Sequence, residues 1–207
     1  MRIAIFGASG KAGIEVVKQA LEKHHKVTAI VRNPDKLLLK HDLLTIVSGD
    51  VFNKPSVRDA VEGQDAVICC LGSGTDLGKT NVRSTGTSNI ISAMQKNKVK
   101  RLIAISAMGV AESWNDLSRF NKFIFAILMK STRADHEAQE IAIKQSGLDW
   151  TIIRPSGLTD MAKTGIYEVG ERIRAETSKI SRADVADLIL KELEQKKMVG
   201  KAVTITN

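Results

Sequence analysis

Short apolar runs alternate with stretches of helical periodicity along this chain. The apolar runs cover residues 1–6, 27–31, 44–47, 66–71, 102–105, 150–155 and 202–206. Helical spacing covers residues 11–22, 81–97 and 135–145, and two stretches that open at Ser56 and Ser181. Because run 66–71 is apolar throughout, it is typical of a parallel strand buried on both faces. The pattern predicts an α/β protein with a Rossmann-like, doubly wound, mostly parallel sheet, helices on both faces and a single domain over residues 1–207.

The helices can be given ends and buried faces from the sequence. Ser56 and Ser181 each stand three residues before an aspartate, which is the spacing of a capping box, so we expect each to open a helix. We expect Gly147 to stop the helix over 135–145. The expected buried residues are Val82, Ile90, Ile91 and Met94 in the helix over 81–97, and Ala138, Ile141 and Ala142 in the helix over 135–145.

Two segments interrupt the regular pattern. Residues 156–180 look like an irregular excursion, and residues 107–133 are apolar without being regular. The second segment places Leu117, Phe120, Ile124 and Leu128 on one helical face. Its surplus apolar residues, Phe123, Phe125 and Met129, could line a substrate pocket, cover it as a lid or form a dimer contact, although core packing is the usual role of an apolar helix. We expect the two segments to form a small region that covers the substrate.

A glycine-rich loop, GASGKAG over residues 7–13, joins the first apolar run to the first helix. A phosphate must approach the backbone closely, so side chains at Gly7 and Gly10 would obstruct it, and Gly13 would let the helix pack tightly on the strand. The helix N-terminus offers free N–H groups and a partial positive charge to a pyrophosphate. The order strand, loop, helix, strand over residues 1–32 therefore predicts a dinucleotide site; the alternative is an ordinary glycine-rich turn.

Arg32 ends the second apolar run, where the adenosine ribose of a dinucleotide is expected. An acidic residue there would repel a 2′-phosphate, whereas an arginine binds one. Lys36 follows closely and could join it. The sequence therefore favours NADPH over NADH. The alternatives are that Arg32 is a surface cation, or that Asp35 serves the ribose instead.

The carboxyl ends of the other strands supply the remaining candidates, because open α/β sheets bind ligands there. Asp50 and Val51 follow the third strand beside the expected adenine, although Asp50 could equally be a turn residue. Leu71 and Gly72 end the fourth strand and should pass close to the cofactor. Ser106 ends the fifth strand, where its hydroxyl would face the nicotinamide; the alternative is that it only caps the strand end.

Composition excludes several classes of function. The chain has 207 residues, of which 43% are hydrophobic, and a formal net charge of +8. The positive charges are scattered, so we expect no nucleic-acid partner. The densest apolar stretch is too short to span a bilayer, and the first strand leaves no room for a signal peptide. We expect a cytoplasmic protein without a membrane partner.

The cysteines and histidines give no sign of metal binding. Cys69 and Cys70 are adjacent in an apolar strand, so they point to opposite faces and have neither metal spacing nor a resolving partner. We expect buried structural thiols. The histidines are dispersed, and we expect no metal site.

Longer motifs resemble a known family. GASGKAG, the segment VRNP, SGDV after the third strand, GQDAVICCLG, AISA and SGLDWTIIRPSGL are similar to the atypical short-chain dehydrogenases with an NAD(P)H-binding domain. Within that group, GQDAVI, the SGL turn and the segment around Thr164, Gly165 and Tyr167 most resemble the biliverdin-IXβ reductases, also called NADPH-dependent flavin reductases. The resemblance implies a monomer that uses NADPH to reduce FMN, FAD, riboflavin or linear tetrapyrroles.

The resemblance also implies roles for particular residues. It assigns Gly7, Ser9, Gly10, Lys11 and Ala12 to the pyrophosphate, Arg32 and Lys36 to the 2′-phosphate, Asp50 and Val51 to the adenine, and Leu71, Gly72, Ser106 and Pro155 to the ribose and nicotinamide. The expected substrate pocket consists of Met108, Trp114, His136, Ser156 and Gly157. The family has a histidine where this chain has Ser156-Gly157, which puts biliverdin activity in doubt. His136 resembles another family histidine; its alternative is a solvent-facing helix residue.

The absence of one catalytic motif points to the reaction. Typical short-chain dehydrogenases use a Tyr-x-x-x-Lys pair, because hydride addition to a carbonyl makes an alkoxide that needs a proton. The only tyrosine here is Tyr167, and Glu171 stands where the lysine would be. A flavin needs less help, so the protein's task is to hold two flat rings together, with Ser106 orienting the nicotinamide. The alternatives are a non-catalytic NmrA-like dinucleotide sensor and, less favoured, a nucleotide-sugar epimerase-like enzyme.

Overall fold

A computed structural model describes residues 1–72, 81–116, 132–173 and 179–207. The α-helices are α1 (Lys11–Glu22), α2 (Lys54–Val61), α3 (Val82–Lys96), α5 (Arg133–Lys144) and α6 (Arg182–Gln195), with 3-10 helices η1 (Pro34–Lys36) and η2 (Ala111–Asp116). The strands are β1 (Arg2–Phe6), β2 (Lys26–Val31), β3 (Leu44–Ser48), β4 (Ala66–Cys69), β5 (Arg101–Ile105), β6 (Asp149–Pro155), β7 (Gly157–Thr159), β8 (Glu168–Gly170), β9 (Lys179–Ser181) and β10 (Lys201–Thr206).

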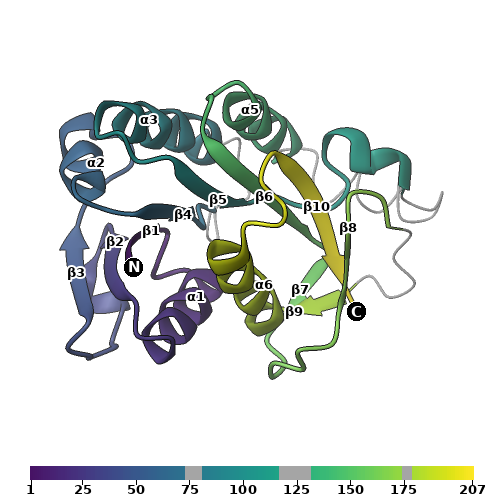
Figure 1. Ribbon diagram of the computed structural model, residues 1–207, viewed down its shortest axis with the longest axis horizontal. Helices are drawn as coiled ribbons and strands as arrows, with labels where there is room; N and C mark the ends of the chain where they lie inside the picture. Colours follow the sequence, from purple (N-terminus) through teal and green to yellow (C-terminus); the bar gives the residue numbers. More distant parts are fainter. Residues whose placement is uncertain (73–80, 117–131, 174–178) are drawn as a thin grey trace.

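The main sheet confirms the predicted doubly wound architecture. Its strand order is β3-β2-β1-β4-β5-β6-β10-β8, and every pair is parallel except β10 with β8. Helices α1 and α6 cover one face, and α2, α3 and α5 cover the other (Figure 1). The strand order reverses between β1 and β4, and ligands of such sheets bind beyond the carboxyl ends of the strands at that point.

The central strands feed two cores because successive side chains point to opposite faces. In β1, Ile3 and Ile5 pack with α1 and α6, whereas Ala4 and Phe6 pack with α2 and α3. All four side chains are fully buried. This explains why the strands read as continuous apolar runs.

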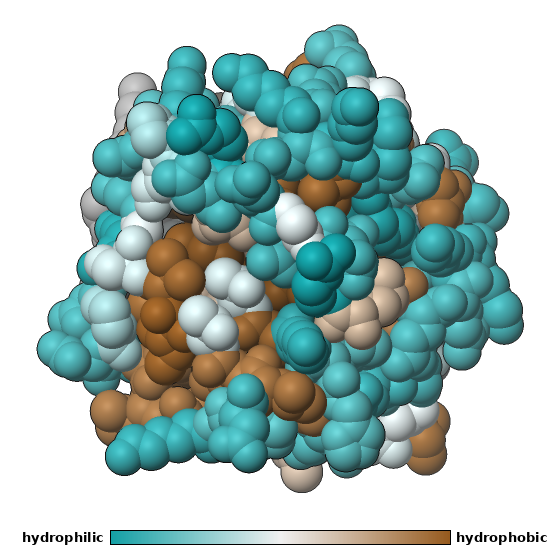
Figure 2. Space-filling model, turned by 60° about the vertical axis from the view of Figure 1, so that its left-hand side comes forward, coloured by the Kyte–Doolittle hydropathy of each residue, from teal (hydrophilic) through white to brown (hydrophobic). Residues whose placement is uncertain are grey.

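The edge strand β3 is less covered than the centre. Its side chains are half-buried or exposed, including half-buried Leu44 and Ile46. Figure 2, which brings the β3 side forward, shows a hydrophobic area surrounded by hydrophilic residues. None of the helices in the described ranges is long and apolar enough to cross a membrane.

Two of the predicted helix features are wrong. Helix α2 begins at Lys54, before Ser56, because the side chain of Asn53 accepts a hydrogen bond from the Ser56 N–H and caps the helix. Helix α5 exposes Ala138 and 55% of Ile141, which we expected to be buried, and leaves Ala142 half-buried. Its buried face consists of Asp135, His136, Gln139, Glu140 and Ile143. That face is polar because it packs against polar groups of α3 and of the strand ends.

The structure describes most of one of the two irregular segments and only the ends of the other. The excursion contains three short strands: β7 pairs with β9, and β8 pairs with β10. Ser181 caps α6 as predicted, because its hydroxyl accepts a hydrogen bond from the Asp184 N–H at 2.9 Å. The expected helical face of Leu117, Phe120, Ile124 and Leu128 lies outside the described residues.

Candidate functional site

The glycine loop lies where β1 gives way to α1. Gly7 has φ +77°, and a Cβ built on it would lie 2.4 Å from the Cys70 carbonyl oxygen. A Cβ on Gly13 would lie 2.2 Å from the Gly7 carbonyl oxygen, so Gly13 provides the close helix–strand approach that we expected. Gly7 is therefore required by the end of β4 as well as by any phosphate.

The N-terminus of α1 fits a dinucleotide pyrophosphate. Gly10 is its N-cap residue, no side chain caps it, and its first turn has no acidic residue. By contrast, Asn53 and Ser181 cap α2 and α6. The nearest atom to a Cβ on Gly10 is the Gly7 oxygen at 3.2 Å. The first-turn N–H groups are thus left for an external acceptor, which is the arrangement that binds phosphate in this fold.

The residues that are predicted to bind the adenosine half of the cofactor are largely exposed. Arg32 follows β2 and Lys36 lies in η1, and both side chains are exposed. Among the described residues, neither has an ion-pair partner. Asp50 accepts a hydrogen bond from the Phe52 N–H at 2.9 Å, so it does act as a turn residue. Val51 is buried, and its contact with adenine stays a prediction.

Leu71 and Gly72 follow β4 at the same edge of the sheet. Leu71 is half-buried and Gly72 is exposed. A Cβ on Gly86 of α3 would lie 2.7 Å from Leu71 Cδ1. Helix α3 therefore approaches the end of β4 closely and forms one wall of this part of the site.

Ser106 belongs to a buried polar cluster at the ends of β5 and β6. Its Oγ donates to Glu140 Oε1 at 2.7 Å and lies 3.4 Å from His136 Nδ1. Arg154 donates to both oxygens of Glu140, from Nε at 2.9 Å and from Nη2 at 2.5 Å. Since its proton is committed to Glu140, Ser106 has only acceptor capacity left for a ligand.

Glu112 extends this cluster outward. Its Oε2 accepts from Arg154 at 2.7 Å, and its Oε1 accepts from Lys144 at 2.9 Å. These hydrogen bonds, Lys144 first, lower the pKa of Glu112 to about 2. Burial acts to lower the pKa of Arg154, but the two carboxylates raise it overall. These hydrogen bonds and ion pairs fix the wall behind Ser106.

The expected pocket residues are partly brought together. The Met108 N–H donates to the Pro155 carbonyl at 2.9 Å, which joins the segments after β5 and β6. Ser156 is buried, and within the described part of the chain its hydroxyl has no hydrogen-bond partner. Trp114 is half-buried beneath the Arg133 guanidinium, 4.3 Å from the ring centroid. Gly157 is exposed and starts β7.

His136 is buried, so its alternative as a solvent-facing residue is wrong. Burial, then the charge of Arg83, lowers the pKa of His136 to about 4. The imidazole is therefore neutral at pH 7. It lies beside Ser106 as a polar wall residue and is not charged there.

Sequence analysis missed Glu140, Arg154, Asp135 and Arg83. The available signal was the spacing of polar residues in α5, where His136 and Glu140 stand four apart and share a face. Polar helix faces are usually exposed, so this spacing alone does not predict burial. The residues that bind this face are distant in sequence, and no local pattern indicates that they meet it.

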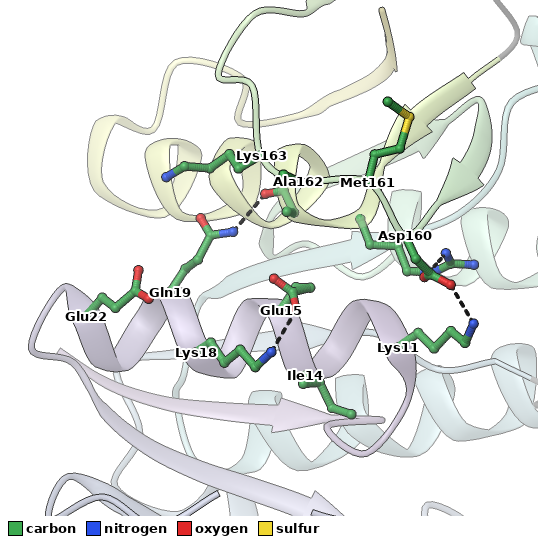
Figure 3. A pocket seen from close by; sticks show the side chains of 12 residues that line it. Lys11, Ile14, Glu15, Lys18, Gln19, Glu22, Asp160, Met161, Ala162 and Lys163 are labelled. Carbon is green, nitrogen blue, oxygen red and sulfur yellow. Dashed lines mark hydrogen bonds and ion pairs between the residues drawn. The ribbon is translucent and has the colours of Figure 1, made fainter.

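Lys11 ties the glycine loop to the excursion. Its Nζ donates to Asp160 Oδ2 at 2.6 Å, and Arg182 donates to the other oxygen of Asp160 at 2.5 Å. These side chains lie along a groove of about 560 Å³ between α1, residues 160–163 and the start of α6 (Figure 3). Lys11 is the only predicted site residue that lines the groove.

Tyr167 is hydrogen-bonded to two residues of α6. Its hydroxyl donates to Asp187 Oδ2 at 2.7 Å and accepts from Lys191 Nζ at 3.1 Å. Burial, then Asp187, raises the pKa of Tyr167 to about 12. The phenol therefore anchors the excursion to α6, and it is a poor proton donor.

Cysteine and metal chemistry add nothing to the site. Cys69 is buried and Cys70 half-buried, and burial raises the pKa of both thiols. Within the described ranges, no group of three or more His, Cys, Asp or Glu side chains could hold a metal ion.

Comparisons with known proteins agree with this geometry. Residues 7–196 match the model of a family described as NAD(P)H-binding. The chain is 30% identical over 217 residues to the uncharacterized protein YwnB of Bacillus subtilis (strain 168), covering 100% of this chain and 99% of that protein. A Rossmann-fold NAD(P)-binding family protein from Shigella flexneri is 30% identical with a TM-score of 0.77, covering 100% of this chain and 93% of that chain. ChuY, an anaerobillin reductase from Escherichia coli O157:H7, is 23% identical with a TM-score of 0.82 and covers 99% of this chain and 96% of that chain, a likeness of fold.

Proposed function

Because the chain belongs to the NAD(P)H-binding family, we propose that it is an NADPH-dependent reductase whose acceptor is a flavin such as FMN, FAD or riboflavin. The observation that carries the proposal is the hydrogen bonding of the chain's one tyrosine. Tyr167 donates its proton to Asp187, so it is not available to protonate an alkoxide. An acceptor that spreads the added charge over its own ring system does not need such an acid. Linear tetrapyrroles share this property and are the second acceptor class.

The bound cofactor would supply a hydride, and a solvent proton would complete the reduction. The chain's own residues bind and orient. The first turn of α1 holds the pyrophosphate, and Arg32 with Lys36 holds the 2′-phosphate. Ser106 accepts a hydrogen bond from the nicotinamide carboxamide, because its own proton is committed to Glu140. Proximity of the two rings then provides most of the catalysis.

NADPH oxidation with FMN, repeated with NADH, tests the proposal. We expect turnover with NADPH to exceed turnover with NADH. Replacing Arg32→Ala removes charge-assisted hydrogen bonds worth about 1.5–3 kcal/mol, so kcat/KM for NADPH should fall about tenfold to a hundredfold while that for NADH is unchanged. The matched control is Arg58→Ala, which removes an exposed arginine of α2 that pairs with Asp59.

Two results would contradict the proposal. Equal effects of Arg32→Ala on both cofactors would remove Arg32 from the 2′-phosphate site. Tight NADPH binding without oxidation in the presence of FMN, riboflavin or biliverdin would indicate a dinucleotide sensor instead of a reductase.

A further inference from the structure

Arg83 is a largely buried arginine with unsatisfied donors, and it lies close to Gly72 at the end of β4. It lies in the first turn of α3, and only 12% of its side chain is exposed. Among the described residues, its Nε and Nη1 have no hydrogen-bond partner. Buried polar groups in native proteins are nearly always hydrogen-bonded, so such a group calls for an explanation.

Asp135 holds Arg83 in place without satisfying it. The Asp135 carboxylate accepts from the Arg83 N–H at 3.1 Å, from the Ser84 N–H at 2.9 Å and from Ser84 Oγ at 2.6 Å. These bonds cap α3. The Arg83 guanidinium reaches the same carboxylate only as an ion pair, with Nη1 3.5 Å from Oδ2. The carboxylate therefore balances the charge of Arg83 and leaves its N–H groups for another acceptor.

Arg83 lies beside the segment that is expected to pass close to the nicotinamide half of the cofactor. A Cβ on the exposed Gly72 would lie 3.7 Å from Arg83 Nη2. Its ion-pair partner Asp135 directly precedes His136, whose Nδ1 lies 3.4 Å from Ser106 Oγ. Arg83 thus lies near the end of β4 and is connected through α5 to the end of β5. The cofactor's phosphates have other candidate partners, because α1 offers its N-terminus and Arg32 follows β2.

We propose that Arg83 binds an anionic group, a phosphate or a carboxylate, on the acceptor substrate. The inference rests on the proposed reductase function and narrows it to acceptors that carry a negative charge near the reducible ring system. An arginine fits this task because its planar fork of donors matches the oxygens of phosphate and carboxylate. Burial lowers the pKa of Arg83 and Asp135 opposes that shift.

FMN and riboflavin test the proposal, because they share one ring system and differ by a phosphate. We expect the wild-type protein to have a kcat/KM at least tenfold higher for FMN than for riboflavin. Arg83→Gln should abolish that preference by lowering the value for FMN at least tenfold and changing the value for riboflavin less than twofold. Arg83→Lys should keep part of the preference. Arg58→Gln, which replaces an exposed arginine of α2, is the matched control and should leave the ratio of the two kcat/KM values unchanged.

The outcomes separate this inference from the proposed function. Equal losses with both flavins, or a raised KM for NADPH with either flavin, would overturn the role of Arg83. If the wild-type protein oxidises no NADPH, the proposed function fails, and flavin fluorescence in the presence of NADP⁺ replaces turnover as the readout. Binding of FMN that is weakened by Arg83→Gln would then still support the anion site, whereas no discrimination between the flavins would refute it. Biliverdin compared with its dimethyl ester distinguishes a carboxylate from a phosphate.

Discussion

Gly10 and Gly13 lie in the same loop, but the structure requires glycine only at Gly13. At Gly13 a side chain would meet backbone, because its Cβ would lie 2.2 Å from the Gly7 oxygen. At Gly10, where φ is −75°, a Cβ would make one tight contact, with the Gly7 oxygen at 3.2 Å, which a shift of a few tenths of an ångström relieves. Gly13 is thus a requirement of folding, whereas we predict that Gly10 is required by the ligand.

Alanine substitutions should separate these two requirements. Gly13→Ala forces the loop away from α1, and overpacking of this kind costs about 1–3 kcal/mol of the free energy of unfolding. Gly10→Ala should change that free energy by less than about 1 kcal/mol, because alanine adopts the same backbone conformation. It should nevertheless weaken NADPH binding at least tenfold. Urea unfolding and fluorescence titration measure the two effects, and loss of stability in Gly10→Ala with unchanged binding would reverse the assignment.

The residues that could be predicted are those whose role follows from their neighbours in sequence. Gly7 and Gly13 take their structural roles from a contiguous strand, loop and helix, and the 2′-phosphate role of Arg32 stays a prediction from the strand that follows. Glu140 and Arg83 could not be predicted, because each acts through a partner far along the chain. Ser106 is 34 residues from Glu140, and Arg83 is 52 residues from Asp135. The fold, not the local pattern, creates these contacts.

At the scale of elements, α5 departs most from its expected behaviour. The helix turns its polar side inward: Asp135 caps α3, and Glu140 binds Arg154 of β6. Ile141 is left 55% exposed on the other side. The helix is therefore fixed by hydrogen bonds and ion pairs rather than by an apolar stripe, and its buried histidine should make stability depend on pH.

The pKa of His136 predicts the direction of that dependence. Its pKa is about 4 in the folded chain and 6.5 in the unfolded chain, so between these values the unfolded chain binds more protons. Stability should be full above pH 6.5 and fall as the pH decreases toward 4. The loss attributable to His136 between pH 7.5 and pH 5 is about 2 kcal/mol.

Urea unfolding of His136→Gln at these two pH values checks the prediction. The stability difference between pH 7.5 and pH 5 should shrink by about 2 kcal/mol relative to the wild-type protein. His24→Asn is the control, because His24 is exposed with φ +57°, a conformation that asparagine tolerates. An undiminished difference in His136→Gln would mean that His136 is not the titrating group. His25, whose pKa is also lowered, contributes equally in each protein.

Most elements could be predicted because apolar periodicity and end signals agree. Helix α1 spans Lys11–Glu22 as expected, and α3 lies between the expected limits. The start of α2 was misplaced because two cap residues compete within a few positions, and Asn53 wins over Ser56. The short strands β7 and β9 have no periodic pattern in the sequence. They form because the fold brings these two distant segments together, where they pair with each other.

At the scale of the whole molecule, hydrogen bonds and ion pairs join the excursion over residues 156–180 to α6 and to the predicted dinucleotide-binding loop. Asp184 of α6 accepts hydrogen bonds from the Thr164 and Gly165 N–H groups at 2.9 and 2.8 Å. Asp160 bridges Lys11 and Arg182. The loop that is expected to bind the cofactor is therefore connected to α1, α6 and the excursion together, and a ligand bound there should stabilise the whole fold.

Thermal unfolding measures this coupling. A ligand at 100 times its dissociation constant stabilises a protein by about 2.7 kcal/mol, which should raise the Tm of a domain of this size by about 5–10 °C. We expect NADPH to produce this shift, and NADH at the same concentration to produce a smaller one because Arg32 has no 2′-phosphate to bind. Gly10→Ala should unfold at the wild-type temperature without ligand, and because its affinity is at least tenfold lower, the same NADPH concentration should stabilise it by no more than about half of the wild-type amount. An equal shift by NADH, or a full NADPH response in Gly10→Ala, would show that the cofactor binds without using this loop and Arg32.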